Sequence, residues 1–342
     1  MTDYTSWFRS LGLEDWCNAS GEDALPSLAD LAARSNPDTA GTGGGPLEFP
    51  SLDVLHESCK AVPQSRDFMG WVEDAFLAVK DPLKVVLDPL TQPLSWALEG
   101  ALAGALATPW WLVFLLLCGI VYVTSRSWKL VVLVLVTLSI LSFLDLYSYA
   151  IMTLAIIFVC TTLCLLLGIP MGIAMSRSDR LQKTVLPVLD MLQTLPTFVY
   201  LIPLIFLFSV TEPKLYGIAI ILYAIVPVVR LTDLGIRLVD PEIIEASEAF
   251  GMSRRQRLFG VELPLATPTI MAGVNQTIMM SLAMVVIASL VSAPGLGTLV
   301  LRGISRLELG VGLVSGLAIV MLAIMLDRTS KGAMARMDRN EQ

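Results

Sequence analysis

Apolar segments long enough to cross a membrane dominate this chain after residue 107. We expect seven, each roughly 17–27 residues long, which suits a hydrocarbon core of about 30 Å at 1.5 Å of helix rise per residue. Only 15% of the residues are charged, whereas a soluble domain usually has about 25%. The sequence therefore predicts an all-α polytopic membrane protein. The expected spans are residues 108–124, 128–144, 149–175, 190–210, 215–232, 268–291 and 310–326.

Two polar regions precede the first span. Residues 1–66 are polar and partly irregular, and we expect them to form a periplasmic tail. Residues 67–107 carry apolar side chains at helical spacing between acids and prolines, which is typical of one or two helices lying on the membrane surface. The remaining regions are expected to be two peripheral spans at 108–144, a core at 145–330 that contains short cytoplasmic helices at 240–262, and a cytoplasmic tail at 331–342.

Charge is unevenly spread along the chain. Residues 1–107 hold 16 Asp/Glu and 6 Lys/Arg, a net charge of −10, whereas the rest holds 14 acids and 17 bases. Bases concentrate in alternate connections, which is typical of the cytoplasmic side of a membrane. We therefore predict an inner-membrane protein with a periplasmic N-terminus and a cytoplasmic C-terminus. Arg302 and Arg306 do not fit this topology, and we expect them to bind lipid headgroups or neighbouring acids.

The residue inventory argues against several kinds of chemistry. The single histidine, His56, lies in the tail, which nearly excludes a His-based metal site or a Ser-His triad among the spans. The glycine-rich run at 41–46 lacks the Lys-Ser/Thr of a phosphate-binding loop and is interpreted as a linker. If transport uses ATP, another chain must bind it. Cys17 and Cys59 share the tail; whether they pair is left open.

The polar stretch at 240–264 predicts two short helices with defined ends. Asp240 can cap a helix that begins with Pro241, and Gly251 stands where a glycine would end it. Ser253 and Gln256 have the spacing of a capping box for the second helix. Capped helices between two spans form a rigid element, so we interpret this stretch as a docking element for a soluble partner.

This stretch resembles the cytoplasmic signature of ABC-importer permeases. The resemblance lies in Glu245-Ala246-Ser247, then Gly251, then Val261-Glu262-Leu263-Pro264, where Ser247 and Val261 replace the usual alanine and isoleucine. The sequence from Glu245 to about Arg306, and the run that starts at Leu186, are similar to permeases of betaine/proline-type osmolyte importers, the ProW-like group. The resemblance covers about residues 140–330.

The resemblance implies a type I ABC importer permease fold and a transport subunit rather than an enzyme. The implied partners are a second permease copy, two ATPase subunits, a periplasmic substrate-binding protein and membrane lipid, with no nucleic acid. No cofactor is expected on this chain, because ATP and Mg would bind the ATPase. The implied substrate is glycine betaine, proline betaine, choline, carnitine or trimethylamine N-oxide. The choice among them, homodimer against heterodimer, and the role of residues 1–107 stay open.

The resemblance also implies that the first short helix is a coupling helix, which seats in a groove of the ATPase. Glu245 is expected to pair with a basic residue there, and small residues are expected to let the helix sit close. The expected coupling residues are Glu245, Ala246, Ser247, Ala249, Phe250, Gly251, Arg254, Arg255, Leu263 and Pro264.

Polar residues in or beside the fourth and sixth spans are candidates for the translocation path, because polar groups in a span usually face a cavity or the bundle interior. The alternative is that they only hydrogen-bond neighbouring helices. Asp190 is expected to pair with an Arg or Lys of the loop at 177–183. The candidates are Gln193, Thr197, Tyr200, Asn275, Gln276, Ser281 and Ser289.

The alternative function is a secondary transporter or channel for small solutes that needs no ATPase. Such a protein would require ionisable side chains within its spans. Here only Asp145 and Arg230 lie near span ends. A membrane enzyme is a third class, but the spans lack a constellation of His, Cys or carboxylate residues.

Overall fold

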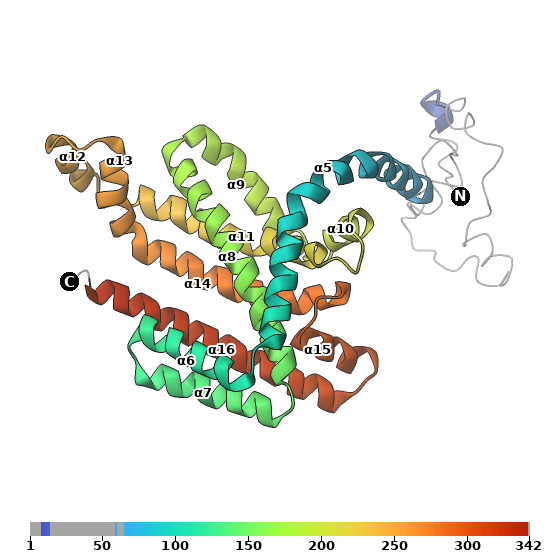
Figure 1. The fold of residues 1–342 in the computed structure, drawn as a ribbon. Helices are drawn as coiled ribbons and strands as arrows, with labels where there is room; N and C mark the ends of the chain where they lie inside the picture. Colours follow the sequence, from blue (N-terminus) through green and yellow to red (C-terminus); the bar gives the residue numbers. More distant parts are fainter. Residues whose placement is uncertain (1–7, 14–58, 60–64, 341–342) are drawn as a thin grey trace, which may run out of the picture. The chain divides into compact units, whose positions relative to one another are not determined.

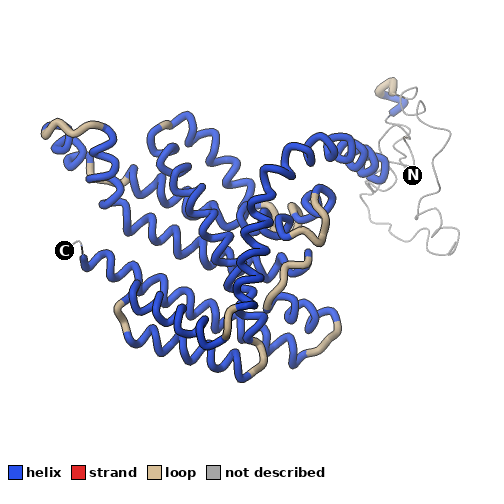
Figure 2. Tube along the Cα trace, in the orientation of Figure 1, coloured by secondary structure: helices blue, strands red, loops and turns tan. Residues whose placement is uncertain are grey.

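The computed structural model describes residues 8–13, 59 and 65–340. Within these residues every regular element is helical (Figure 2), which confirms the all-α prediction. The chain divides into two compact units, Met1–Leu83 and Lys84–Gln342, and the second contains all the expected spans. Most of the expected tail at 1–66, Cys17 included, lies outside the described residues, while Cys59 is disulfide-bonded.

One long helix and a helical hairpin precede the core. The region expected to form one or two surface helices is a single helix, α5 (Ser65–Ala107). It is followed by α6 (Trp110–Ser125) and α7 (Trp128–Phe143), whose sequences are apolar on all sides. Both helices of this hairpin pack against the C-terminal helix, α16 (Leu309–Asn340), as Figure 1 shows.

Three long helices form the centre of the core. They are α8 (Tyr147–Arg177), α11 (Pro213–Arg237) and α14 (Leu263–Ala288), and α11 packs extensively on both others. The other elements are α9 (Asp179–Thr194), α10 (Leu201–Leu207), α12 (Pro241–Ala249), α13 (Arg254–Arg257), the π-helical turn η2 (Leu258–Glu262), the single turn η3 (Ser289–Val291) and α15 (Leu296–Ser305).

Glycines allow the three central helices to approach closely. A Cβ at Gly172 of α8 would stand 2.5 Å from the Cβ of Thr232 and 2.7 Å from the carbonyl oxygen of Val229, both on α11. A Cβ at Gly273 of α14 would lie 3.2 Å from the carbonyl oxygen of Pro227. Small residues at helix contacts are the usual means of packing in membranes, where lipid offers no hydrophobic drive for association.

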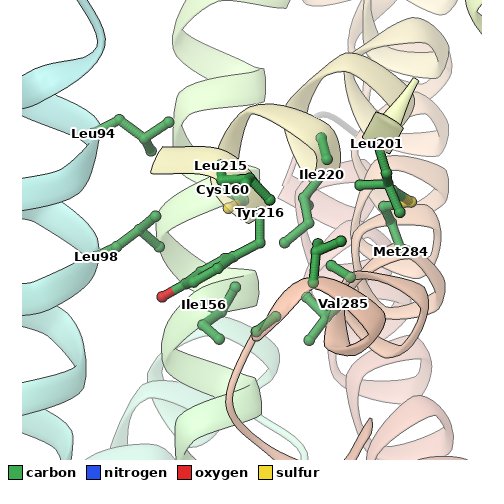
Figure 3. Packing of buried hydrophobic residues seen from close by; sticks show 14 of the residues in the cluster. Leu94, Leu98, Ile156, Cys160, Leu201, Leu215, Tyr216, Ile220, Met284 and Val285 are labelled. Carbon is green, nitrogen blue, oxygen red and sulfur yellow. The ribbon is translucent and has the colours of Figure 1, made fainter. Parts of the chain in front are cut away.

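A buried apolar cluster joins the centre to its neighbours (Figure 3). Ile156 and Cys160 come from α8, Tyr216 from α11 and Met284 from α14. Leu98 of α5 is also fully buried there, and a Cβ at Gly217 would stand 2.7 Å from its side chain. The C-terminal part of α5 is thus part of the core packing rather than a separate surface element.

Four described helical segments are long and apolar enough to cross a membrane, or five if α5 and α6 form one broken span. They are Tyr147–Arg177, Pro213–Arg237, Arg254–Val291 and Leu309–Arg336. The count of seven spans stays a prediction. The expected span at 190–210 is interrupted, because α9 ends at Thr194 and α10 begins at Leu201. Leu195 is extended before Pro196, and the ring of a proline disfavours helix in the residue before it.

Replacing Gly172 by alanine tests the close packing. We expect Gly172→Ala to lower the unfolding temperature in detergent, because an added methyl group without room costs about 1–3 kcal/mol. The control is Gly119→Ala in α6, where nothing lies within 4 Å of the new Cβ, so no loss of stability is expected. Equal unfolding temperatures for the two variants would contradict the packing described here.

Candidate functional site

The candidate site is the pair of short helices α12 and α13, which extends from the ends of α11 and α14 (Figure 1). The carboxylate of Asp240 accepts a hydrogen bond of 2.9 Å from the backbone N–H of Glu242. Pro241 occupies the first helical position, where its missing N–H costs nothing. The helix therefore starts where the sequence predicts.

Gly251 ends α12. Its φ of +77° lies in the left-handed region, which glycine adopts without strain. Its N–H donates to the carbonyl of Glu248 at 2.9 Å, and the N–H of Met252 donates to the carbonyl of Ser247 at 3.2 Å. These two bonds form a Schellman motif, which satisfies the last carbonyls of the helix.

The predicted capping box of the second helix is present. The backbone N–H of Gln256 donates to Ser253 Oγ at 3.4 Å, and the backbone N–H of Ser253 donates to Gln256 Oε1 at 2.9 Å. The short chain between the two helices therefore has fixed hydrogen bonds on both sides, so α12 and α13 form a rigid tip.

Large apolar side chains are exposed on this tip. The side chain of Phe250 is 85% exposed, and those of Ile243 and Met252 are about 41% and 40% exposed. Glu245 is also exposed. A cluster of this kind on a surface outside the apolar spans is typical of a protein contact.

The other predicted coupling residues fall into three groups. Ala246, Ala249, Arg254 and Arg255 are exposed. Ser247 is buried against its own chain, with its hydroxyl donating to the carbonyl of Ile244 at 2.7 Å. Leu263 and Pro264 are half-buried at the start of α14.

Two arginines bind Glu262 at the base of the tip. Glu262 Oε2 accepts from Arg177 at 2.5 Å, and Oε1 accepts from Arg257 at 2.9 Å. Arg257 also contacts Glu248 of α12. Sequence reasoning assigned no role to these ion pairs, although Glu262 lies inside the matched signature.

A second group of charges joins the ends of α8, α9 and α11. Arg237 binds Asp179 at 2.8 Å and Asp233 at 3.0 Å, and it donates to the carbonyl of Met175 at 2.8 Å. Gln182 donates to the other oxygen of Asp233 at 2.7 Å. We call these residues the Arg237 cluster.

The expected pairing of Asp190 with the loop at 177–183 is wrong. Asp190 instead contacts Arg230 of α11. α9 packs along α11, so a partner distant in sequence lies nearer to Asp190 than the loop at the start of its own helix.

Three candidate path residues, two on α14 and one at the start of η3, hydrogen-bond within the protein. Asn275 contacts Asp327, at 3.3 Å, and Ser330 of α16. Ser281 accepts from Thr161 of α8 at 3.2 Å, and Ser289 donates to the carbonyl of Val285 at 3.2 Å. The bonds of Asn275 and Ser281 match the alternative interpretation, in which polar groups join neighbouring helices, whereas the bond of Ser289 stays within its own helical segment.

The remaining candidates are not gathered at one place. Gln193 lies exposed near the end of α9, and Gln276 lies exposed on α14. Thr197 and Tyr200 are half-buried in the connection between α9 and α10. A cavity of about 460 Å³ lies between α6, α7 and the start of α8, and none of these candidates lines it.

The family model described as "Binding-protein-dependent transport system inner membrane component" matches residues 164–339, which include α12, α13 and the central helices α11 and α14. The chain belongs to the family of inner membrane components of binding-protein-dependent transport systems.

Within this family the chain is similar to the glycine betaine/proline betaine transport system permease protein ProW of Salmonella typhimurium. The two are 52% identical over 186 residues, which is 54% of this chain and 52% of the relative. The glycine betaine/carnitine transport permease protein GbuB of Listeria monocytogenes is 41% identical over 226 residues, 65% of this chain and 79% of the relative. The expected ProW-like group is confirmed, although the match spans only about half the length of ProW.

A chain of the MetNI methionine ABC transporter, solved in an inward-facing conformation, has a similar fold. It is 19% identical, the match covers 56% of this chain and 95% of that chain, and the TM-score is 0.51. This likeness confirms the predicted ABC importer permease fold of the core.

Replacing Gly251 by alanine tests the end of α12. An L-residue in the left-handed region costs about 1–2 kcal/mol, so we expect Gly251→Ala to speed hydrogen exchange at the Met252 amide about five- to thirty-fold. The control is Gly260→Ala, which has open space around its Cβ and no positive φ. Unchanged exchange at Met252 in the Gly251 variant would contradict the assigned cap.

Proposed function

We propose that this chain is the transmembrane permease subunit of an ABC importer for glycine betaine-like osmolytes or small methylated amines. A separate ATPase subunit binds and hydrolyses ATP with Mg, and a periplasmic binding protein delivers the substrate. A second permease copy completes the pathway. Family membership and similarity to ProW and GbuB, whose names state glycine betaine, proline betaine and carnitine, support the proposal.

The observation that carries the proposal is the rigid, exposed tip formed by α12 and α13. Phe250 offers a large apolar anchor, and Glu245 offers a charge for a basic partner residue. A buried aromatic anchor at the centre of an interface commonly supplies much of its binding energy. The tip leads through η2 directly into α14, so a partner that binds the tip holds the end of a span.

The orientation proposed for the chain places this tip in the cytoplasm, with the N-terminus in the periplasm. The basic residues of the tip, Arg254 and Arg255, then lie on the side where bases accumulate. Arg302, which this orientation places outside, has an acidic neighbour, because it pairs with Glu308 at 3.3 Å.

The candidate path residues are retained as proposed path residues where their side chains are accessible. Gln193 and Gln276 meet this condition, and Thr197 and Tyr200 meet it in part. Asn275, Ser281 and Ser289 already have protein partners, so any contact with substrate would compete with those bonds.

Reconstitution tests the function. The chain is placed in liposomes with the ATPase subunit and the binding protein of its own transport system, and uptake is measured for glycine betaine, proline betaine, choline, carnitine and trimethylamine N-oxide. We expect uptake of at least one of them that needs all three components and ATP. Uptake driven by an ion gradient without the ATPase would instead support a secondary transporter.

A variant of the tip identifies the docking surface in the same system. We expect Phe250→Ala to weaken ATPase binding by about 2 kcal/mol, roughly 30-fold, and Glu245→Lys to weaken it as well. The matched control is Phe143→Ala at the end of α7, where the side chain is 91% exposed. Equal ATPase binding by the Phe250 and Phe143 variants would reject the assigned docking surface.

A further inference from the structure

Four charged side chains of alternating sign connect the exposed tip to the central helices. Glu248 of α12 contacts Arg257 of α13, Arg257 binds Glu262 of η2, and Glu262 binds Arg177 at the C-terminal end of α8. We call these four residues the arginine–glutamate link. It joins elements that are up to 85 residues apart in sequence.

Burial makes the centre of this link rigid. The side chain of Glu262 is only 3% exposed, and each of its carboxylate oxygens has its own arginine donor. Arginine holds a carboxylate in a defined orientation, because its guanidinium group is planar and always charged. Separating Glu262 from Arg177 or Arg257 would leave one oxygen of the buried carboxylate without its arginine, so the separation costs free energy.

The backbone at Glu262 is also unusual. Helix continues from Arg254 to Val291, and residues 258–262 within it form a π-helical turn. Such turns are rare and frequently occur at functional positions, because the extra residue changes the direction in which following side chains point. Here the turn ends at Glu262, whose carboxylate reaches α8.

We infer that the arginine–glutamate link makes α12 and the cytoplasmic ends of α8 and α14 move together when the ATPase moves the tip. Glu262 and Arg177 are positioning residues: they contact neither ATP nor the transported molecule, and they act through α12. This inference rests on the proposed function. Without the link, α12 would lose its charged connection to α8, and its displacement would be partly absorbed in its chain connections and its packing on α13 and η2.

The Arg237 cluster serves as an internal control for the arginine–glutamate link. It also consists of carboxylates bound by an arginine at the same ends of α8 and α11, but no contact described for it reaches α12 or α14. If ion pairs at this end serve only stability, both groups should respond alike to substitution. If the link transmits movement, only its own members should alter coupling.

The experiment uses whichever of the five compounds the unaltered chain imports fastest, and it measures molecules imported per ATP hydrolysed, together with the amount of ATPase bound, in the reconstituted system. We expect Glu262→Gln to retain the ATPase while import per ATP falls about fivefold or more. A glutamine offers one acceptor oxygen, so it satisfies only one of the two arginines. Asp233→Asn, which removes a carboxylate charge that is only 6% exposed from the Arg237 cluster, is expected to keep the import-to-ATP ratio of the unaltered chain.

Variants at Arg177 separate coupling from loss of folding. Arg177→Gln is expected to lower the ratio like Glu262→Gln, and Arg177→Lys, which keeps a positive charge and one donor for Glu262 but not the planar group, is expected to lower it less. If Glu262→Gln does not assemble with the ATPase, the import-to-ATP ratios of the two Arg177 variants test the inference by themselves. Ratios equal to that of the unaltered chain in the glutamine variants would overturn the inference. No import by the unaltered chain would reject the proposed function itself, and the inference with it.

Discussion

The buried carboxylate of Glu262 is the interaction on which the arrangement of the proposed cytoplasmic end depends. A carboxylate that is almost removed from solvent needs partners for both oxygens, and Arg177 and Arg257 supply them. Loss of one partner in such a site costs about 3–5 kcal/mol, because the remaining charge stays buried. The positions of α8, α13 and α14 are therefore linked through one side chain, and α12 joins them through Glu248.

The central helices to which the arginine–glutamate link is attached form a rigid, closely packed unit. Gly172 and Gly273 let α8 and α14 approach α11 so closely that a Cβ would meet backbone oxygens. Packed helices of this kind slide or rotate as bodies and do not deform continuously. Movement of the tip is then passed to whole helices. A capped α12 with exposed apolar residues suits the proposed docking role for the same reason, because a loose loop would absorb the displacement.

Local rules predicted the short helices well. Asp240, Gly251 and the Ser253–Gln256 pair act on their immediate neighbours, so the chain sequence contains all the information that their roles require. Contacts between distant segments were missed. Neither Arg177–Glu262 nor Arg230–Asp190 has a sequence spacing that would reveal it, because the first depends on how α8 packs against α14 and the second on how α9 packs against α11. Pro196 gave a local signal for the break before α10, but apolar residues on both sides favoured a continuous span.

The most direct test of the account is a distance measured during the ATP cycle. Spin labels at position 242 of α12 and position 174 of α8, both exposed in this structure, report whether the two elements move together. In the complete reconstituted transporter, with only one permease chain per complex labelled, we expect the distance between these two labels to be the same without nucleotide and with ATP bound. A distance that changes on ATP binding would show that α12 moves independently of α8, and would contradict the account.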